Sequence, residues 1–150
     1  MENMTLTGFL SENVIKPACV EYVASKRFKG ANGKPIAWQI TPISNDENRA
    51  IADRNRKKSF VPGTRETQVH LDQDQYVNDL ICACVTYPNL NSEELQNSYN
   101  AVGAGELVRL MLTPGEYSDL FQAVMQANNF EVGMDEKIKA VKNYLRRASS

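Results

Sequence analysis

The residues best suited to chemistry in this 150-residue chain are one histidine and three cysteines. His70 with Cys82 or Cys84 would supply a base and a thiol, which is what an activated thiol nucleophile needs. On a helix, however, Cys82 and Cys84 point about 200° apart, so the two thiols cannot bind one metal ion together. Their alternating apolar neighbours favour core packing. We therefore expect neither a catalytic dyad nor a metal site here.

Two acid pairs are the next candidates. Asp72 with Asp74 and Glu93 with Glu94 each stand at a predicted helix start, where capping and the helix dipole explain carboxylates. A carboxylate dyad would need convergence of distant residues that the sequence does not show. The sequence thus predicts no catalytic residue, no cofactor and no metal.

Gly33-Lys34 invites comparison with a phosphate-binding loop. Such a loop needs four residues between its glycines and a Ser or Thr after the lysine. Here two residues separate Gly30 from Gly33, and Pro35 follows Lys34. The segment instead has the composition of a hairpin turn between two apolar runs.

The register of that hairpin follows from the face it must bury. A three-residue loop, Ala31-Asn32-Gly33, pairs Phe28 with Ile36 and Lys26 with Trp38, with Gly33 in the left-handed conformation. A two-residue turn would place the two apolar runs on opposite faces. The longer loop puts on one face the following residues: Val20, Tyr22, Ala24, Phe28, Ile36, Trp38 and Ile40.

Helix signals dominate the rest of the chain. Capping residues and apolar spacing predict helices over about 45–58, 72–86, 106–112 and 113–128, a short one capped by Ser92 or Asn91, and a last one from Asp135. Residues 59–66 are predicted as a loop, and Thr67–Leu71 as a short extended segment. The apolar stripe from Tyr117 to Met125 favours core packing over a partner groove.

These elements predict an α+β, mainly helical single domain over residues 1–150, with an N-terminal β-hairpin and five or six short helices. The ends, residues 1–8 and 148–150, are expected to be flexible. No apolar run approaches the ~20 residues of a membrane span, and the N-terminus lacks a signal-peptide core. With three cysteines and no disulfide spacing, the sequence indicates a cytoplasmic protein with reduced thiols.

The net charge of −1 conceals strong segregation. Residues 1–65 hold 11 Lys/Arg against 6 Asp/Glu, residues 66–136 hold Arg109 against 12 acids, and the last fourteen residues hold five bases and no acid. Such a surface can orient a partner, or the ends can neutralise the middle. The sequence leaves both possibilities open.

One alternative function rests on the basic residues. The run Arg54–Lys58, with Lys26, Arg27 and Lys29 on the hairpin, could bind nucleic acid, and Phe28 and Trp38 could stack bases. Against this, the acidic middle repels phosphate and the pI is about 5.9. Nucleic acid is therefore not the expected partner, but a small nucleic-acid-binding or regulatory protein is the alternative.

Three stretches carry a family resemblance: SENVIKP; VEYVASKRFKGANGKPIAWQITPIS; and YVNDLICACVTYPNLNSEELQNSYNAVGAGELVRLMLTPGEYSDLFQAVMQANNF. From Phe9 to Phe130 the chain resembles the XkdN-like phage tail assembly chaperones of prophages and tailed phages of Gram-positive bacteria. The hairpin and LTPGEYSDLF are the most specific parts, and residues 55–68 match least.

The resemblance implies a non-enzymatic protein of the bacterial cytoplasm that is absent from the mature virion. It implies binding to the tape-measure protein, which is kept soluble while tail-tube subunits assemble; the tail-tube protein is a second implied partner. Some families also make a longer frameshifted form, a signal that lies in the RNA. The resemblance implies no site residue, so the partner-binding residues stay undefined.

Overall fold

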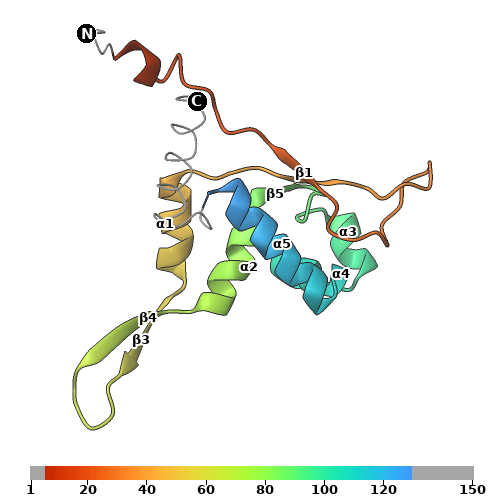
Figure 1. Cartoon of the computed structure of the whole chain (residues 1–150). Helices are drawn as coiled ribbons and strands as arrows, with labels where there is room; N and C mark the ends of the chain where they lie inside the picture. The colour runs from red at the N-terminus through yellow and green to blue at the C-terminus, as the bar shows by residue number, and fades with distance from the viewer. Residues whose placement is uncertain (1–5, 130–150) are drawn as a thin grey trace, which may run out of the picture.

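The computed structural model describes residues 6–129 of the chain. Its five α-helices and five strands form a helical body with two small antiparallel sheets, which confirms the predicted α+β class (Figure 1). In chain order the elements are the 3-10 helix η1 (Thr7–Phe9), β1 (Val20–Tyr22), β2 (Trp38–Ile40), α1 (Asn45–Arg54), β3 (Arg56–Phe60), β4 (Thr67–Leu71), α2 (Gln73–Cys84), β5 (Val85–Tyr87), α3 (Glu93–Ser98), α4 (Ala104–Met111) and α5 (Pro114–Ala127).

Helix α2 is the centre of the body. It packs against α1, α4 and α5, and its side chains Leu80, Ile81 and Cys84 are fully buried. Strands β1, β2 and β5 form a three-stranded sheet in that order, and β2 also contacts α5. Trp38 and Ile40 of β2 are 1% and 0% exposed. Burial of apolar surface between helices and sheet therefore holds the body together.

The N-terminal hairpin is partly as predicted. Gly33 has φ +75°, and a bridge between Lys29 and Pro35 matches the predicted register at the tip. At the base, however, Trp38 pairs with Tyr22 and not with Lys26, so that prediction was wrong. Six residues separate Tyr22 from Lys29 of the bridge, whereas two residues separate Pro35 from Trp38 on the other side. The first side of the hairpin therefore contains four extra residues. Because four is an even number, Tyr22 and Trp38 still share a face.

Burial and hydrogen bonding explain why the extra residues do not pair with the second strand. Ala24 and Ser25 turn inward and are 5% and 4% exposed. The Arg27 guanidinium donates to the Met111 carbonyl oxygen at 3.0 Å and also reaches Glu116. The burial of Ala24 and Ser25 and the hydrogen bonds of Arg27 together stabilise this path of the chain more than a regular strand would. The Arg27 bonds depend on residues 84 and 89 positions away.

The first helix ends earlier than predicted. Ser44 caps α1 through the Glu47 amide, as expected, but the helix stops at Arg54. The basic residues that follow form β3, which pairs with β4 from Arg56↔Leu71 to Phe60↔Thr67. The expected extended segment Thr67–Leu71 is confirmed. Its partner strand replaces the predicted end of the helix and the start of the predicted loop.

The remaining helix starts were well predicted. Asp72, Ser92 and Thr113 each accept a hydrogen bond at their helix starts, and Thr113 with Glu116 forms the full capping box. Helix α2 ends at Cys84 and not Thr86, because Val85–Tyr87 pairs with β2. Helix α4 starts two residues earlier than predicted.

Some predictions lie outside the described residues. The helix expected from Asp135 and the chain ends 1–5 and 148–150 are among them, whereas Thr7–Phe9 forms η1. Within residues 6–129, no helix is long and apolar enough to cross a bilayer.

Candidate interaction surfaces

The three residues considered for a thiol–histidine dyad lie on two different elements, β4 and α2. His70 is an exposed residue of β4, paired with Lys57 across the ladder. Cys84 is buried within α2, and Cys82 is half-buried there. Burial raises the pKa of Cys82 to about 11 and also raises that of Cys84, so the neutral thiol is favoured at neutral pH. None of the described hydrogen bonds joins His70 to either thiol.

The acid pairs have the structural roles expected of them. Asp72 accepts from the Gln75 amide and pairs with the Lys57 ammonium at 2.8 Å; the Lys57 contact is the main cause that lowers its pKa. Glu93 and Glu94 occupy the first turn of α3. Among residues 6–129, no group of three or more His, Cys, Asp or Glu side chains could hold a metal ion.

The Gly30–Lys34 segment is a turn that uses its own amides. The Gly33 amide donates to the Gly30 carbonyl at 2.9 Å, and the Lys34 amide donates to Asn32 Oδ1 at 3.0 Å. With the Gly30 amide donating to the Lys34 carbonyl at 3.0 Å, three of the five amides of the segment bond within it, as in a hairpin turn.

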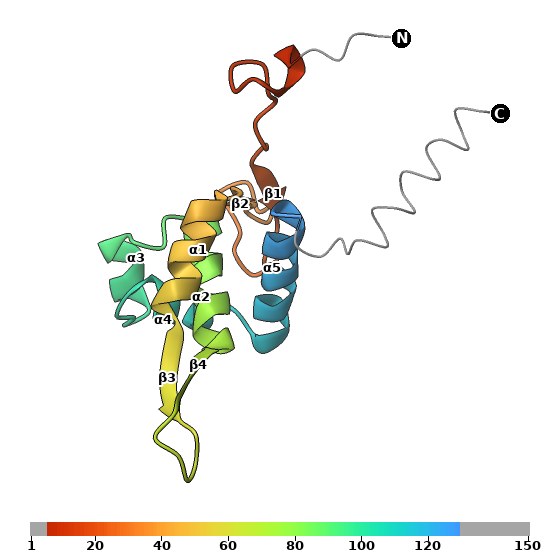
Figure 2. The same ribbon diagram turned by 90° about the vertical axis from the view of Figure 1, so that its left-hand side faces the viewer.

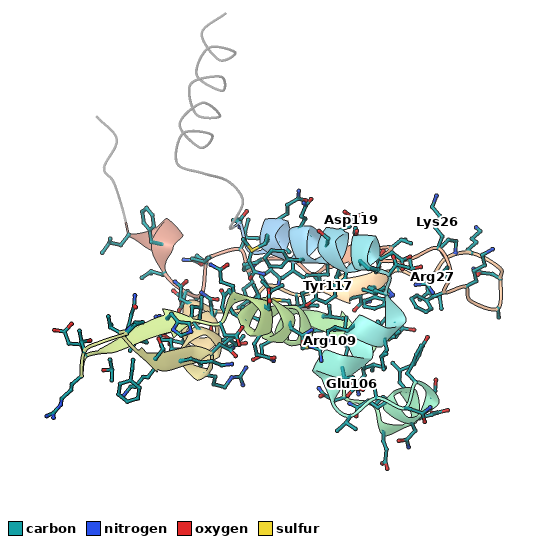
Figure 3. All side chains as sticks on the ribbon, turned by 90° about the horizontal axis from the view of Figure 1, so that it is seen from below. Lys26, Arg27, Glu106, Arg109, Tyr117 and Asp119 are labelled. Carbon is teal, nitrogen blue, oxygen red and sulfur yellow. The ribbon has the colours of Figure 1, made fainter. Side chains whose placement is uncertain are left out.

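Arg27 and Glu116 form the strongest polar contact between distant elements. Figure 3 places Lys26 and Arg27 beside the start of α5, where Glu116 completes the capping box. Hydrogen bonds from Arg27, from Ser25 and from the Thr113 amide lower the pKa of Glu116 to about 2. The Arg27 guanidinium also lies 5.4 Å from the centre of the Phe28 ring. The ion pair therefore fixes the hairpin base against α5.

The described ion pairs show how the segregated charges are arranged. Arg27–Glu116, Arg54–Asp79 and Lys57–Asp72 each join a base from residues 1–65 to an acid from residues 66–136. The N-terminal bases thus neutralise part of the acidic middle, one of the two arrangements that the sequence left open.

This arrangement bears on the basic run Arg54–Lys58. Arg54 and Lys57 pair with α2 and with its cap, and Arg56 pairs with Asp53 at 3.0 Å. Arg56, Lys57 and Lys58 lie on a projecting hairpin, β3–β4, in which all residues but Val61 and Leu71 are exposed (Figure 2). Trp38, proposed for base stacking, is 1% exposed and lies against Phe28. The hairpin is therefore a weaker phosphate-binding surface than its composition suggests.

The apolar stripe of α5 belongs to the core, as predicted. Leu120 and Val124 are fully buried, and Tyr117, Phe121 and Met125 pack against the core. Tyr117 also lines a cleft of about 650 Å³ with Arg109 and Asp72, whose charged side chains make it a polar surface.

An apolar pocket opens between the hairpin and the segment from β5 to α3. It has a volume of about 190 Å³. Its lining includes Phe28, Ile36, Trp38, Tyr87, Leu95 and Tyr99. Periodicity did not reveal it, because its walls come from three segments that meet only in the fold.

The second unpredicted surface is the segment before β1, residues 6–19, called here the N-terminal arm. Every residue of the arm is exposed, including Leu6, Phe9, Leu10, Val14 and Ile15. In both views it leaves the body at β1, at the end opposite β3–β4 (Figures 1 and 2). In the sequence, the feature that could have indicated this surface is the presence of five large apolar residues within ten positions.

The described residues thus define a small α+β protein with exposed apolar surfaces and, within 6–129, no metal-binding cluster. The chain belongs to the phage XkdN-like tail assembly chaperone family, whose model matches residues 6–142. This confirms the resemblance found in the sequence.

Two relatives extend this finding. The chain is 23% identical over 139 residues to the uncharacterized protein YqbN of Bacillus subtilis (strain 168), covering 92% of this chain and 93% of the relative. A crystal structure of the protein YqbN is similar, with a TM-score of 0.71 and 21% identity, covering 87% of this chain and 100% of that chain. At this identity the structural likeness shows the fold alone.

Proposed function

We propose that this protein is a non-enzymatic tail assembly chaperone that acts as one domain over residues 1–150. It binds the tape-measure protein in the cytoplasm of the bacterial host and keeps it soluble while tail-tube subunits assemble. It is absent from the mature virion. The observation that carries this proposal is the family match across residues 6–142.

Physical arguments support the same function. A tape-measure chain exposes long apolar helical stretches that aggregate unless another surface covers them. Covering them needs reversible contact and no reaction. Exposed apolar residues such as Ile15, Phe60 and Val102, which are 94%, 75% and 84% exposed, supply contact surface of this kind, and the buried thiols and capping acids have structural roles.

Co-expression tests the proposal directly. The tape-measure protein of the same phage is expressed with this chain and, as the control, with the same gene carrying an early stop codon. We expect a larger soluble fraction with the intact chain and recovery of both proteins together. Equal insolubility in the two cultures contradicts the proposal. A tape-measure gene downstream and a tail-tube gene upstream would support it further.

A further inference from the structure

Two apolar features have no partner among residues 6–129. The first is the N-terminal arm, which is ordered by its own hydrogen bonds: the Phe9 amide donates to the Leu6 carbonyl and Asn13 Nδ2 to the Thr7 carbonyl, both at 2.9 Å. These bonds form a compact turn that presents the Phe9 ring to solvent. Ordering in advance lowers the entropic cost of binding, so the turn resembles a ligand more than a loose tail.

The second feature is the apolar pocket. A dry apolar cavity of about 150 Å³ is enough to hold benzene, so a pocket of about 190 Å³ accepts one phenyl ring. It is smaller than the ~300 Å³ or more of typical small-molecule sites. Larger clefts elsewhere are lined by charged side chains, among them Asp72, Arg109 and Asp119. The apolar pocket can therefore receive a ring without burying an unpaired charge.

The N-terminal arm does not run toward the apolar pocket of the same chain. It joins β1 at Val20, whereas the pocket lies past the opposite end of the strand, beyond the Tyr22–Trp38 pair. The arm also leaves the body in the direction away from the hairpin tip (Figures 1 and 2). A second copy of the chain supplies the same arm without this constraint.

The length of the arm and the charges near it are compatible with its binding to the pocket of a second copy. The turn extends to Val14, whose amide donates to the Leu10 carbonyl at 3.2 Å. Beyond it, residues 15–19 allow a span of roughly 20 Å to Val20, comparable to the radius of a domain of this size. Glu12 is the one charged residue between Leu6 and Ile15, whereas residues 22–45 hold Lys26, Arg27, Lys29 and Lys34 with no acid. By the register at the tip, Lys34 lies on the same face of the hairpin as Phe28 and Ile36, which line the pocket.

We propose that two copies of this chain exchange their N-terminal arms, with Phe9 of each copy in the apolar pocket of the other. Because each copy gives one arm and receives one, a two-fold axis closes the assembly as a dimer. The exchange requires no tape-measure protein, so it can be tested independently of the chaperone function.

The oligomeric state is measured on the full chain by light scattering after size exclusion. We expect twice the 16.8 kDa chain mass at about 100 µM and dissociation on dilution. Phe9→Asp should raise the dimer dissociation constant at least about 100-fold, since both ring contacts are lost. Val102→Asp is the matched control, because Val102 is equally exposed at 84% and lies outside both surfaces.

A complementation experiment identifies the exchange itself. Leu95→Asp places an unpaired carboxylate in the pocket lining, so this variant keeps its arm but does not receive a phenyl ring, whereas Phe9→Asp keeps its pocket. Each variant alone should be monomeric. Their mixture should form a weaker heterodimer, because one arm–pocket contact is restored. Trp38, the single tryptophan, lines the pocket, and its fluorescence in the Phe9→Asp copy should change on mixing.

Three results would overturn the proposal. One is a full chain that stays monomeric at every concentration, and another is a dimer that Phe9→Asp and Val102→Asp weaken equally. The third is a mixture of the two variants that stays monomeric although each is folded by circular dichroism.

Discussion

At the scale of single residues, Glu116 does more than its place in a capping box suggests. The Thr113-Pro114-Gly115-Glu116 pattern predicted the helix start correctly, because a capping box involves neighbours in sequence. The pattern held no information about Arg27, which reaches Glu116 from 89 positions away. One carboxylate thus both starts α5 and fixes the hairpin base.

Glu116→Gln separates these roles, because glutamine can still cap the helix but cannot form the ion pair. The folded-state pKa of Glu116, about 2, lies below the ordinary value of 4.5. Its charge therefore stabilises the fold above pH 4.5, and this stabilisation is lost as the pH falls toward 2. We expect the variant to melt at a lower temperature at pH 7 and the two melting curves to converge near pH 2.

Melting followed by circular dichroism between pH 7 and pH 2 measures this difference. Glu21→Gln is the control, since Glu21 is an exposed residue of β1 with no described ion pair. A difference between wild type and Glu116→Gln that stays constant across the whole pH range would be incompatible with an ion-pair role.

At the scale of elements, the sequence predicted the features that neighbouring residues decide and missed those that depend on contacts between distant residues. Caps at Ser44 and Thr113 and the turn at Gly33 are decided by neighbours in sequence, so the sequence was enough to place them. The four-residue insertion in the hairpin depends on Arg27 meeting Glu116. The strand β3 depends on pairing with β4, because Lys and Arg by themselves favour a helix. The apolar pocket needs three segments together, so no local pattern could reveal it.

Contact between helices also explains a glycine. A Cβ on Gly105 of α4 would lie 2.4 Å from Oδ1 of Asn78 in α2. Asn78 is 1% exposed, and its Nδ2 donates to the Gly105 carbonyl at 3.3 Å and to the Tyr117 hydroxyl at 3.1 Å. This one side chain joins α2, α4 and α5, which leaves no room for a larger residue at position 105.

Gly105→Ala should therefore lower the free energy of unfolding by about 1–3 kcal/mol, because Asn78 must move from its hydrogen bonds. Gly115→Ala is the matched control: it lies in the first turn of α5, and its Cβ meets nothing within 4 Å. That change should be neutral or stabilise by up to about 1 kcal/mol.

Urea unfolding measures both changes. The cost of Gly105→Ala should shrink in an Asn78→Ala background, since the clashing atom is then gone. An equal cost in both backgrounds would show that the clash is not the cause.

At the scale of the whole molecule, the distribution of charge decides between partners. The net charge is −1, and three N-terminal bases are already paired with acids of the middle segment. Nucleic acid would have to compete with these internal acids and overcome the field of those left unpaired. Apolar partners face no such competition at the N-terminal arm or at the apolar pocket.

We therefore expect the purified full chain to pass through a duplex-DNA column unretained at about 0.1 M salt, since the net charge is −1 and the acids of residues 66–136 oppose contact with phosphate. Arg56→Glu with Lys57→Glu should behave like the wild type. The control, Lys16→Glu with Arg49→Glu, makes the same change of charge outside β3 and the N-terminal hairpin. The opposite result would be salt-dependent retention that is lost in the β3 variant and kept in the control. Because the two variants have equal net charge, only a local contact could distinguish them, and β3–β4 would then be a nucleic-acid surface.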